Sequence, residues 1–438
     1  MLDIVTDPDP ILRRPAAKAV ASPETRKLAK EMLSMLTPQK GVGLAAPQVG
    51  RAIKLFVARS GKDPKDDDYL PETVILNPQI TVQGKEEELG LEGCLSLPGL
   101  ELPIWRASRI VVSGEDTYGR PLKQTHRGFA ARVIQHETDH LNGILFDQRL
   151  EPLKVVFMGT PEFAAESLRA VHIHPAFEVV MVVTEPDKPA GRGRALKASA
   201  VKEAAESLKL PVWQPEGWKA EQTVQALKKL KPDMLVVVAY GQILPQVVLD
   251  VPQFGAFNLH ASLLPKWRGA APIQAAILMG DVETGVTVMK MTAKLDAGDI
   301  VMSQKTSIKP DATAASLTKE LATIGAKLLP TALMYAACGV VEPKPQSAKD
   351  VSIAPKLTKA DGRIDWTQPA EDISRHVRAM FPWPGAWTEV DGTRLNIVCG
   401  HIKDNRFVPD YVKPEGKAEM ERAAFERGWR GSKLPWKD

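Results

Sequence analysis

The fold of this chain is limited first by a junction near residue 152, where two unlike sequence patterns meet. Before the junction, His136 and His140 lie four apart in a segment of helical period. After it, residues 154–158 form an apolar run that ends in a Gly-Thr-Pro turn at 159–161. A chain of 438 residues also exceeds what one hydrophobic core usually supports. The sequence therefore predicts a multidomain protein whose unrelated parts are joined without a recognisable linker.

The composition is that of an ordinary globular protein, with 44% hydrophobic and 25% charged residues. The formal net charge is only +4, so a nucleic-acid site has to come from local clustering of basic residues. Cys94, Cys338 and Cys399 are odd in number and widely spaced, which favours a reducing compartment. The sequence shows neither a signal-peptide pattern nor a long apolar stretch. We therefore expect a cytoplasmic protein with no membrane partner.

Residues 1–152 show the mixed pattern of an α+β domain. A helical pattern covers residues 24–36. Alternating apolar segments, which are typical of strands, lie at 53–57, 74–80 and 110–113. Gly41 and Gly43 precede small side chains, which indicates either a bend where a ligand approaches the main chain or an ordinary turn.

His136 and His140 fall on one face of the predicted helix, so both imidazoles can reach one metal ion. Glu137 would lie beside that metal and could take a proton from water. This short pattern also arises by chance. The best candidate for a third ligand is upstream, because the Cys94 thiolate would complete a Cys/His/His set with one open position. Alternatively, Cys94 is a small buried hydrophobic residue.

Three motifs follow one another in this half of the chain: GVGLAAPQ at 41–48, EGCLS at 92–96 and QHETDHLNG at 135–143. In this order they resemble the motifs of the peptide deformylase family. The resemblance implies a metallohydrolase that removes the N-formyl group from N-formylmethionyl nascent peptides. It also implies that Cys94, His136 and His140 hold Fe²⁺ or Zn²⁺.

The resemblance assigns further roles to residues around these ligands. Glu137 would act as general base and then as general acid. The Gln48 side chain and the Leu95 backbone N–H would stabilise the oxyanion of the tetrahedral intermediate. Asp139 would pair with Arg106 and support the ligands from behind.

Residues 153–345 change to short apolar runs separated by helical patterns. The runs lie at 154–158, 179–184, 233–239, 256–260 and 286–291. They predict an α/β, doubly wound, Rossmann-like domain with a parallel sheet and helices on both faces. No G-x-G-x-x-G fingerprint follows the first run, which disfavours a dinucleotide. Ligands are still expected beyond the carboxyl ends of the strands.

Polar residues gather after the run at 256–260. Asn258 and His260 are two apart, so they point to the same side of a strand. Asp296 is a carboxylate that could orient the imidazole and raise its basicity. Taken singly, each of these residues is more often structural. Together with the strings VFMGTPEFA, PDKPAGRGR, NLHASLLPKWRGAAPI and LDAGDI, they resemble the methionyl-tRNA formyltransferase family.

That resemblance implies transfer of a formyl group from 10-formyltetrahydrofolate to the amino group of initiator methionyl-tRNA. His260, oriented by Asp296, would assist proton transfer, and Asn258 would hold the developing oxyanion. The residues expected to line the folate site are Ser262, Leu263, Leu264 and Pro265.

Residues 187–202 carry several basic side chains and no acidic residue after Asp187. Pro189, Gly191 and Gly193 predict a loop without regular structure, which would suit phosphate contacts that order on binding. On composition alone, a solvated charge run is as good an interpretation. The resemblance implies tRNA contacts for Lys188, Arg192, Arg194 and Lys197.

Residues 344–347 are predicted to be a linker, and 346–438 a shortened C-terminal domain. FPWPGAWT at 381–388 and KPEGK at 413–417 resemble parts of the family's small, OB-like β-barrel, but several strands between them are missing. The tail at 418–438 is basic and aromatic, which suits either tRNA contact or a solvated helix with a frayed end.

The leading hypothesis is a bifunctional enzyme with both activities of the N-formylmethionine cycle, working near the ribosome. One alternative is that the second half only binds tRNA or the ribosome. The presence of Asn258, His260 and Asp296 argues against that alternative. Another is formyl transfer to an amino sugar, and the basic loop argues against it.

Overall fold

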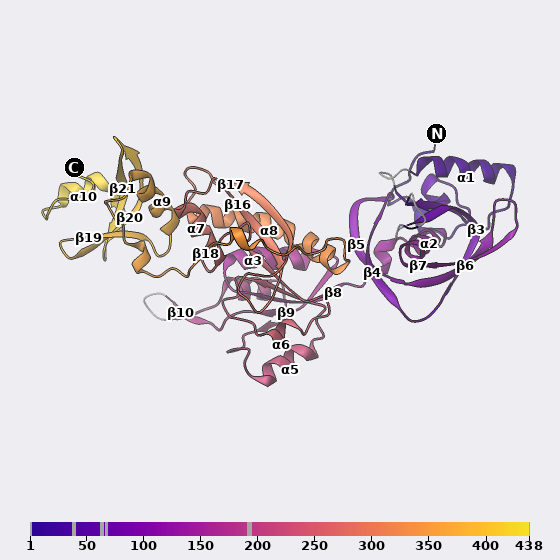
Figure 1. Ribbon diagram of the computed structural model, residues 1–438, viewed down its shortest axis with the longest axis horizontal. Coiled ribbons are helices and arrows are strands. Elements are labelled where there is room, and N and C mark those ends of the chain that lie inside the picture. Colours follow the sequence, from indigo (N-terminus) through magenta and orange to yellow (C-terminus); the bar gives the residue numbers. More distant parts are fainter. Residues whose placement is uncertain (1, 37–40, 62–64, 66–68, 191–194, 438) are drawn as a thin grey trace. The chain divides into compact units, whose positions relative to one another are not determined.

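The computed structural model describes residues 2–36, 41–61, 65, 69–190 and 195–437. The chain divides into two compact units, Met1–Pro152 with Ala337–Val340, and Leu153–Ala336 with Val341–Asp438. The colours in Figure 1 run from indigo to magenta through the first unit and on to yellow through the second. No helix within the described ranges is long and apolar enough to cross a membrane.

The first unit is an α+β fold whose main sheet is antiparallel, in the order β1-β2-β3-β6-β7. The strands of this sheet are β1 (Gly43–Ala45), β2 (Leu55–Ser60), β3 (Leu70–Val82), β6 (Arg109–Glu115) and β7 (Pro121–Arg127). The remaining elements are the hairpin β4 (Glu87–Cys94) and β5 (Leu97–Ala107), and the helices α1 (Pro23–Met35) and α2 (Gly128–Leu141). The helix and strands predicted in this region are confirmed.

Helix α2 lies inside the first unit, where it contacts β1, β2, β3, β5, β6 and β7 (Figure 1). Its Ile134 is fully buried in a core cluster with Phe56 and Val112 of the sheet. Burying a side chain of this size stabilises the fold by about 1.5–3 kcal/mol. The sheet therefore fixes the helix, and the helix in turn fixes His136 and His140.

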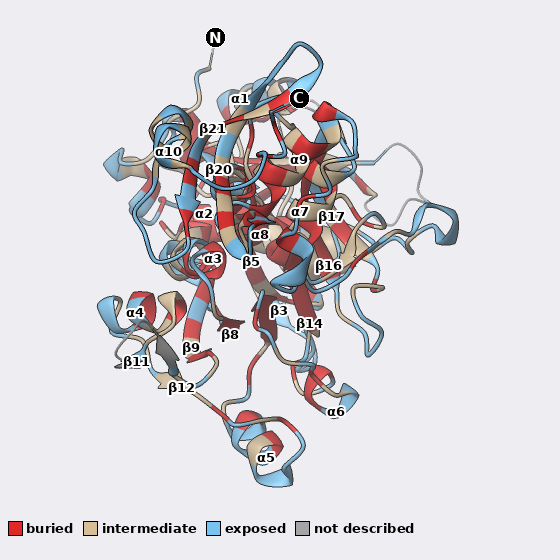
Figure 2. Ribbon diagram, turned by 90° about the vertical axis from the view of Figure 1, so that its left-hand side faces the viewer, coloured by how far each residue is buried: buried red, intermediate tan, exposed pale blue. Residues whose placement is uncertain are grey.

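The second unit contains a seven-stranded sheet in the order β12-β9-β8-β13-β14-β16-β17. Its strands are β12 (Val212–Trp213), β9 (Phe177–Val183), β8 (Leu153–Gly159), β13 (Met234–Val238), β14 (Ala256–His260), β16 (Glu283–Lys290) and β17 (Ile300–Ser307). The helices that accompany it are α3 (Glu162–Ile173), α4 (Ala200–Ser207), α5 (Glu221–Lys229), α6 (Gln246–Leu249), α7 (Pro272–Leu278) and α8 (Ala314–Ala337). Figure 2 shows β14 buried along its length, as expected of a strand covered on both faces.

The prediction of an all-parallel sheet is wrong at one edge. The strands from β12 to β14 run parallel, but β16 pairs with β14 antiparallel, and β17 pairs with β16 antiparallel. After His260 the chain stays at the carboxyl end of β14, so that Thr287 of β16 lies opposite His260. Because β16 starts at that same end, it can only run back antiparallel to β14.

The predicted linker at 344–347 is not a free connection. Lys344 forms an isolated bridge with Ile300, and the strand pair β15 (Arg268–Gly269) and β18 (Ile353–Ala354) follows. The chain between the main sheet and the C-terminal region is therefore hydrogen-bonded to the loop that follows β14.

The C-terminal region begins with α9 (Ala370–Met380), which packs against α7 and β20. A four-stranded antiparallel sheet follows, in the order β19-β20-β21-β22. These strands are β19 (Ala386–Val390), β20 (Thr393–Lys403), β21 (Arg406–Pro414) and β22 (Met420–Glu421), and α10 (Arg422–Gly428) comes after them. The frayed end that was one interpretation of the tail is wrong, because Leu434 and Trp436 are buried.

Candidate active sites

Cys94, His136 and His140 converge in the first unit. Their ligand atoms all lie within 4.8 Å of one another. The two imidazole Nε2 atoms are 3.2 Å apart, and Cys94 Sγ lies 3.3 Å from His140 Nε2. The end of β4 supplies the cysteine and the last turns of α2 supply the histidines. Both elements that carry the predicted ligands therefore meet at one point.

The sequence interpretation did not assign a role to Glu92. Its carboxylate contacts His136 on the ring nitrogen that faces away from the other two ligands. Its side chain is 4% exposed, and Oε2 lies 2.9 Å from His136 Nδ1. Arg106 donates two hydrogen bonds to the same carboxylate, and Arg132 donates one. Burial by itself raises the pKa of Glu92, but the bonds from His136 and Arg106 hold that pKa well below its usual range. Glu92 is therefore a carboxylate with a fixed orientation.

The donor set fits a metal ion. A carboxylate can only accept, so the bond to Glu92 places the proton of His136 on Nδ1 and leaves the Nε2 lone pair facing His140. Cys94 Sγ accepts hydrogen bonds from the Ser96 backbone N–H and from Gln48 Nε2, both at 3.4 Å. Two imidazole nitrogens and a cysteine sulfur directed at one point are a typical zinc or iron ligand set.

Asp139 and Arg106 form the ion pair that the sequence predicts. Asp139 also forms an ion pair with Arg149, in which Asp139 Oδ1 lies 2.7 Å from Arg149 Nη2. Because Arg106 bridges Asp139 and Glu92, it links helix α2 to the hairpin that carries Cys94.

Gln48 is 2% exposed and its amide orientation is fixed. Oε1 accepts from the Ala45 N–H at 2.8 Å, and Nε2 donates to Ser96 Oγ at 3.2 Å. The amide N–H groups therefore face the side where Cys94 lies. Leu95, whose backbone N–H was predicted as a second oxyanion donor, lies between Cys94 and Ser96 and is partly exposed.

Glu137 is 4% exposed, and its Oε2 has no hydrogen-bond partner among the described residues. Burial raises the pKa of this carboxyl group to about 7. Gly43 makes room for it, because a Cβ atom at that position would lie 2.2 Å from Glu137 Oε1. The small residue at the first glycine motif thus leaves space for the carboxylate of Glu137, and the approach of a ligand to the main chain there stays a prediction.

We expect the Glu92→Gln variant to bind its metal about 10- to 100-fold more weakly, because the partner that orients His136 is altered. Metal affinity is measured by competition with a chelator. The matched control is Glu88→Gln, an exposed glutamate on the same strand, which should leave affinity unchanged. Equal affinities for the two variants would contradict the anchoring role of Glu92.

In the second unit, Asn258 and His260 are both buried on β14. His260 Nε2 lies 2.9 Å from the Trp267 carbonyl, which can only accept, so this nitrogen carries the proton. His260 Nδ1 lies 3.8 Å from Asp296 Oδ2, which is longer than a hydrogen bond. Asp296 Oδ2 instead accepts from the Gly269 N–H at 2.8 Å. The structure thus brings the predicted histidine and carboxylate together.

The residues predicted to line a folate site follow directly after His260. Ser262 is fully buried, and its hydroxyl donates to the Lys266 carbonyl at 2.6 Å. Leu264 is also buried, and its N–H donates to Thr287 Oγ1. Leu263 and Pro265 are partly exposed, so they are the two members of the set with surface open to a ligand.

The basic segment predicted to be irregular contains a two-stranded hairpin instead, formed by β10 (Lys188–Ala190) and β11 (Ala195–Lys197). Proline is tolerated there, because an edge position does not need the N–H that proline lacks. Lys188 pairs with Glu185, whereas Lys197 is exposed. Arg192 and Arg194 lie outside the described residues.

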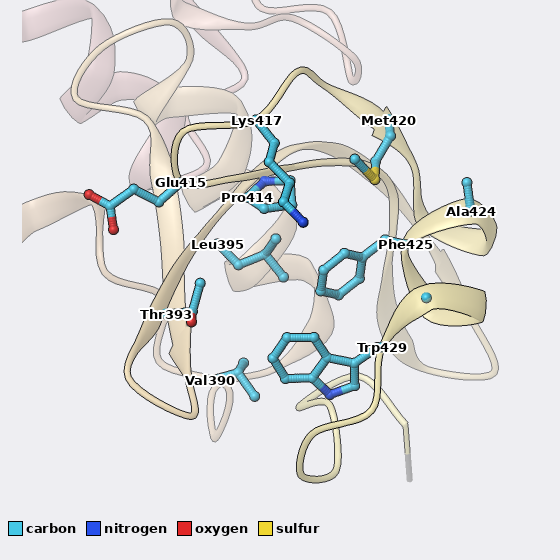
Figure 3. Close-up of a pocket in the computed structure, with 11 residues that line it drawn as sticks. Val390, Thr393, Leu395, Pro414, Glu415, Lys417, Met420, Ala424, Phe425 and Trp429 are labelled. Atoms are coloured by element: carbon cyan, nitrogen blue, oxygen red, sulfur yellow. The ribbon is translucent and has the colours of Figure 1, made fainter.

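A pocket of about 380 Å³ lies between the C-terminal sheet and α10 (Figure 3). The apolar side chains that line it include Leu395, Met420, Phe425 and Trp429, and Lys417 extends toward them. The Phe425 and Trp429 rings are 5.3 Å apart. The tail predicted to contact tRNA thus forms part of a folded surface, and its role stays a prediction.

Relatives named methionyl-tRNA formyltransferase match more than half of the chain. A methionyl-tRNA formyltransferase of Symbiobacterium thermophilum is 50% identical over 302 residues, which cover 63% of this chain and 92% of the relative. The enzyme of the same name from Caulobacter vibrioides is 49% identical over 237 residues, with 54% and 77% covered.

Solved structures of peptide deformylases match about a third of the chain. A class I type b peptide deformylase from Acinetobacter baumannii is 35% identical and covers 34% of this chain and 98% of its own, with a TM-score of 0.32. The peptide deformylase of Thermotoga maritima is 37% identical, with 35% and 99% covered and a TM-score of 0.32.

The two sites define two classes of enzyme on one chain, a metallohydrolase and an α/β group transferase. Residues 1–156 match the polypeptide deformylase family, 153–333 the formyl transferase family, and 356–410 the formyl transferase C-terminal domain. The chain belongs to the methionyl-tRNA formyltransferase family and carries a polypeptide deformylase domain at its N-terminal end. Membership of these families implies a metal for the first half and a folate-type formyl donor for the second.

Proposed function

We propose that this chain is a bifunctional enzyme that hydrolyses the N-formyl group of N-formylmethionyl peptides and formylates initiator methionyl-tRNA. The observation that carries the proposal is the presence of a full reactive set in each unit. Cys94, His136 and His140 converge beside Glu137 in the first unit. Asn258, His260 and Asp296 gather at the end of β14 in the second.

In the hydrolytic half, Cys94, His136 and His140 would hold Fe²⁺ or Zn²⁺. When bound, the metal supplies Lewis-acid polarisation and lowers the pKa of water. Glu137 takes the proton from the attacking water and later returns it to the leaving amine. The Gln48 amide and the Leu95 N–H donate to the oxyanion of the tetrahedral intermediate. The ion pair between Arg106 and Asp139 holds helix α2 against the hairpin formed by β4 and β5.

In the transferase half, the methionyl amino group attacks the formyl carbon of 10-formyltetrahydrofolate. A new C–N bond forms, and the bond from the formyl carbon to the folate nitrogen breaks. His260 takes the proton that the amine loses and then gives a proton to the departing folate nitrogen, and Asp296 stabilises the imidazolium between these two steps. Asn258 donates to the oxyanion. The partly exposed Leu263 and Pro265, with Ser262 and Leu264 behind them, border the folate.

We also propose the domain boundaries, the fold of the C-terminal domain and the location of the enzyme. We place the deformylase domain at 1–152, the formyltransferase domain at 153–345 and a C-terminal domain at 346–438. The C-terminal domain contains a four-stranded sheet. We infer that this sheet corresponds to a shortened, OB-like β-barrel. The enzyme works in the cytoplasm near the ribosome.

The deciding experiment uses the purified full-length chain and 10-formyltetrahydrofolate. We expect it to formylate initiator methionyl-tRNA and, in a separate assay, to deformylate an N-formylmethionyl peptide. Deformylation without any formyl transfer would support a second half that only binds tRNA or acts on another amine, such as an amino sugar.

The hairpin formed by β10 and β11 gives a further prediction. Replacing the exposed Lys197 with alanine should raise the KM for tRNA and reduce the slope of log KM against log salt by about 1, because one phosphate contact is lost. The matched control is Lys229→Ala, an exposed lysine on α5. A salt slope equal to that of the control would argue against phosphate contact.

A further inference from the structure

The segment that joins the main sheet to the C-terminal region contains a side chain with contacts on both sides of the transferase site. We propose that Gln346 is a positioning residue for formyl transfer, because its amide ties the turn that carries Asp296 to the loop that follows His260. This role rests on the formyl transfer proposed above for the same site.

The Gln346 side chain makes hydrogen bonds in two directions. Nε2 donates to the Asp296 carbonyl at 2.9 Å and to the Gly298 carbonyl at 2.7 Å. Oε1 accepts from Arg268 Nε at 2.9 Å and from Arg268 Nη2 at 2.7 Å. Both amide hydrogens and both oxygen lone pairs are therefore used.

The chemistry of the partners leaves only one orientation for this amide. A guanidinium has no acceptor, so the atom that faces Arg268 must be the oxygen. Backbone carbonyls have no donor, so the atom that faces Asp296 and Gly298 must be the nitrogen. A side chain that joins one donor group to two acceptors in this way cannot be replaced by a pure donor or a pure acceptor.

Gln346 is hydrogen-bonded to a tight turn, at residues 296–298, whose backbone conformation is unfavourable by itself. Asp296 has φ +46°, a left-handed conformation that is unfavourable in residues other than glycine. Two residues later, a Cβ atom on Gly298 would lie 1.7 Å from the Lys290 carbonyl, so the turn sits directly on β16. The amide of Gln346 secures both carbonyls of this tight turn.

The other end of the link lies beside the imidazole. Arg268 follows Trp267, whose carbonyl contacts His260 Nε2, and precedes Gly269, whose N–H donates to Asp296 Oδ2. These hydrogen bonds form a closed ring. It runs from Gln346 to Asp296, from Asp296 to Gly269, along the chain to Arg268, and back to Gln346. This ring fixes the distance between the Asp296 carboxylate and His260.

The same segment reinforces the loop at two further points. Ser352 Oγ accepts from the Trp267 N–H at 2.9 Å, and the Ser352 carbonyl accepts from the Arg268 N–H at 2.9 Å. The loop that fixes His260 is thus held by residues that come after the main sheet is complete. No hydrogen bond joins Gln346 to His260 or Asn258 in the described part of the chain, so it acts through Asp296 and Arg268.

The test compares Gln346→Leu and Gln346→Glu with the unaltered full chain. The Gln346→Leu variant loses the four bonds to Arg268, Asp296 and Gly298. The Gln346→Glu variant keeps an acceptor for Arg268 but places a carboxylate against two backbone carbonyls. We expect both to lower kcat for formyl transfer about 10- to 100-fold, as displacement of a reacting group by about 1 Å can do. The KM values and deformylation should stay within about twofold. The control is Gln304→Leu, an exposed glutamine on β17.

A double-mutant cycle with Asp296→Asn separates positioning from general stability. If Gln346 acts through Asp296, adding Gln346→Leu to the Asp296→Asn chain should lower kcat by less than about twofold. Hydrogen exchange at the Gly269 amide gives a readout independent of activity, and Gln346→Leu should speed it while Gln304→Leu should not.

Two outcomes would overturn the assignment, and they differ from a failure of the proposed function. One is full formyl transfer by the Gln346→Glu variant. Only the contact with Arg268 would then matter, and the bonds to the Asp296 and Gly298 carbonyls would have no role in positioning. The other is full additivity in the cycle, which would indicate a structural role alone. An unaltered chain without any transfer would instead refute the proposed function, and the positioning role with it.

Discussion

Replacing Glu137 with alanine should reduce deformylation about 10²- to 10⁴-fold, the range typical of a lost general acid–base group, while the metal stays bound. The structural reason is that Glu137 lies beside the ligands without belonging to them. The three ligand atoms come from Cys94, His136 and His140. Glu137 Oε2 makes no hydrogen bond within the described structure, so its removal leaves no partner unsatisfied.

Three measurements on one preparation check this expectation: kcat/KM on a formylated peptide, metal content, and thermal stability. Glu137→Gln is the matched variant, since it keeps the shape beside Gly43 and removes the basic oxygen. Formyl transfer serves as an internal control and should be unchanged in both variants. Normal turnover by the alanine variant would sink the assignment of Glu137 as the base.

We expect the second large effect from His260→Ala, which should reduce formyl transfer about 10²- to 10⁴-fold. His260 is the buried titratable side chain at the end of β14, and the Asp296 carboxylate lies 3.8 Å from its Nδ1. Without the imidazole the site loses the base that is proposed to take the proton of the attacking amine. The assay follows transfer from 10-formyltetrahydrofolate to initiator methionyl-tRNA under saturating conditions.

The control for this variant is His401→Ala, an exposed histidine on β20 that pairs with Asp410. It should retain full transfer, because surface ion pairs contribute little to stability. Deformylation should be unaffected by either change. Loss of both activities in His260→Ala would contradict two independent sites.

Local spacing made the central residues of both sites predictable. His136 and His140 are four apart on a helix, and Asn258 and His260 are two apart on a strand, so each pair shares a face whatever the rest of the fold does. The need for a third ligand pointed to Cys94, and the family motifs then supported that choice, although no local pattern connects Cys94 with a helix some forty residues later. The roles assigned to these residues stay predictions that the variants above will test.

The supporting residues were harder to find because their contacts are distant in sequence. Glu92 is a carboxylate two residues before Cys94, which is a usable signal. However, the register shifts between Gly93 and Cys94, so strand alternation could not tell which face Glu92 takes. Gln346 lies in a polar stretch that is typical of a linker, and its partners Asp296 and Arg268 are 50 and 78 residues away.

Strand direction and the hairpin were missed for related reasons. An apolar run at 286–291 has the same composition whether it pairs parallel or antiparallel, and only the path taken by the chain after His260 decides the direction. Pro189 suggested irregular structure, but in a two-stranded hairpin it can stand opposite Leu196.

The order of elements along the chain also sets the order in which the two sites are completed during synthesis. The strand β4 and helix α2 supply the whole ligand set, and both end by Leu141. In the second half, strand β8 can pair only after β13, which begins at Met234, has been synthesised. The hydrogen bond from Gln346 to Asp296 forms later still. Because domains emerging from a ribosome fold as units, the hydrolase can mature while the transferase is still a nascent chain. A nascent chain that has passed the junction would therefore already carry the ligand set of the first site before the second site exists.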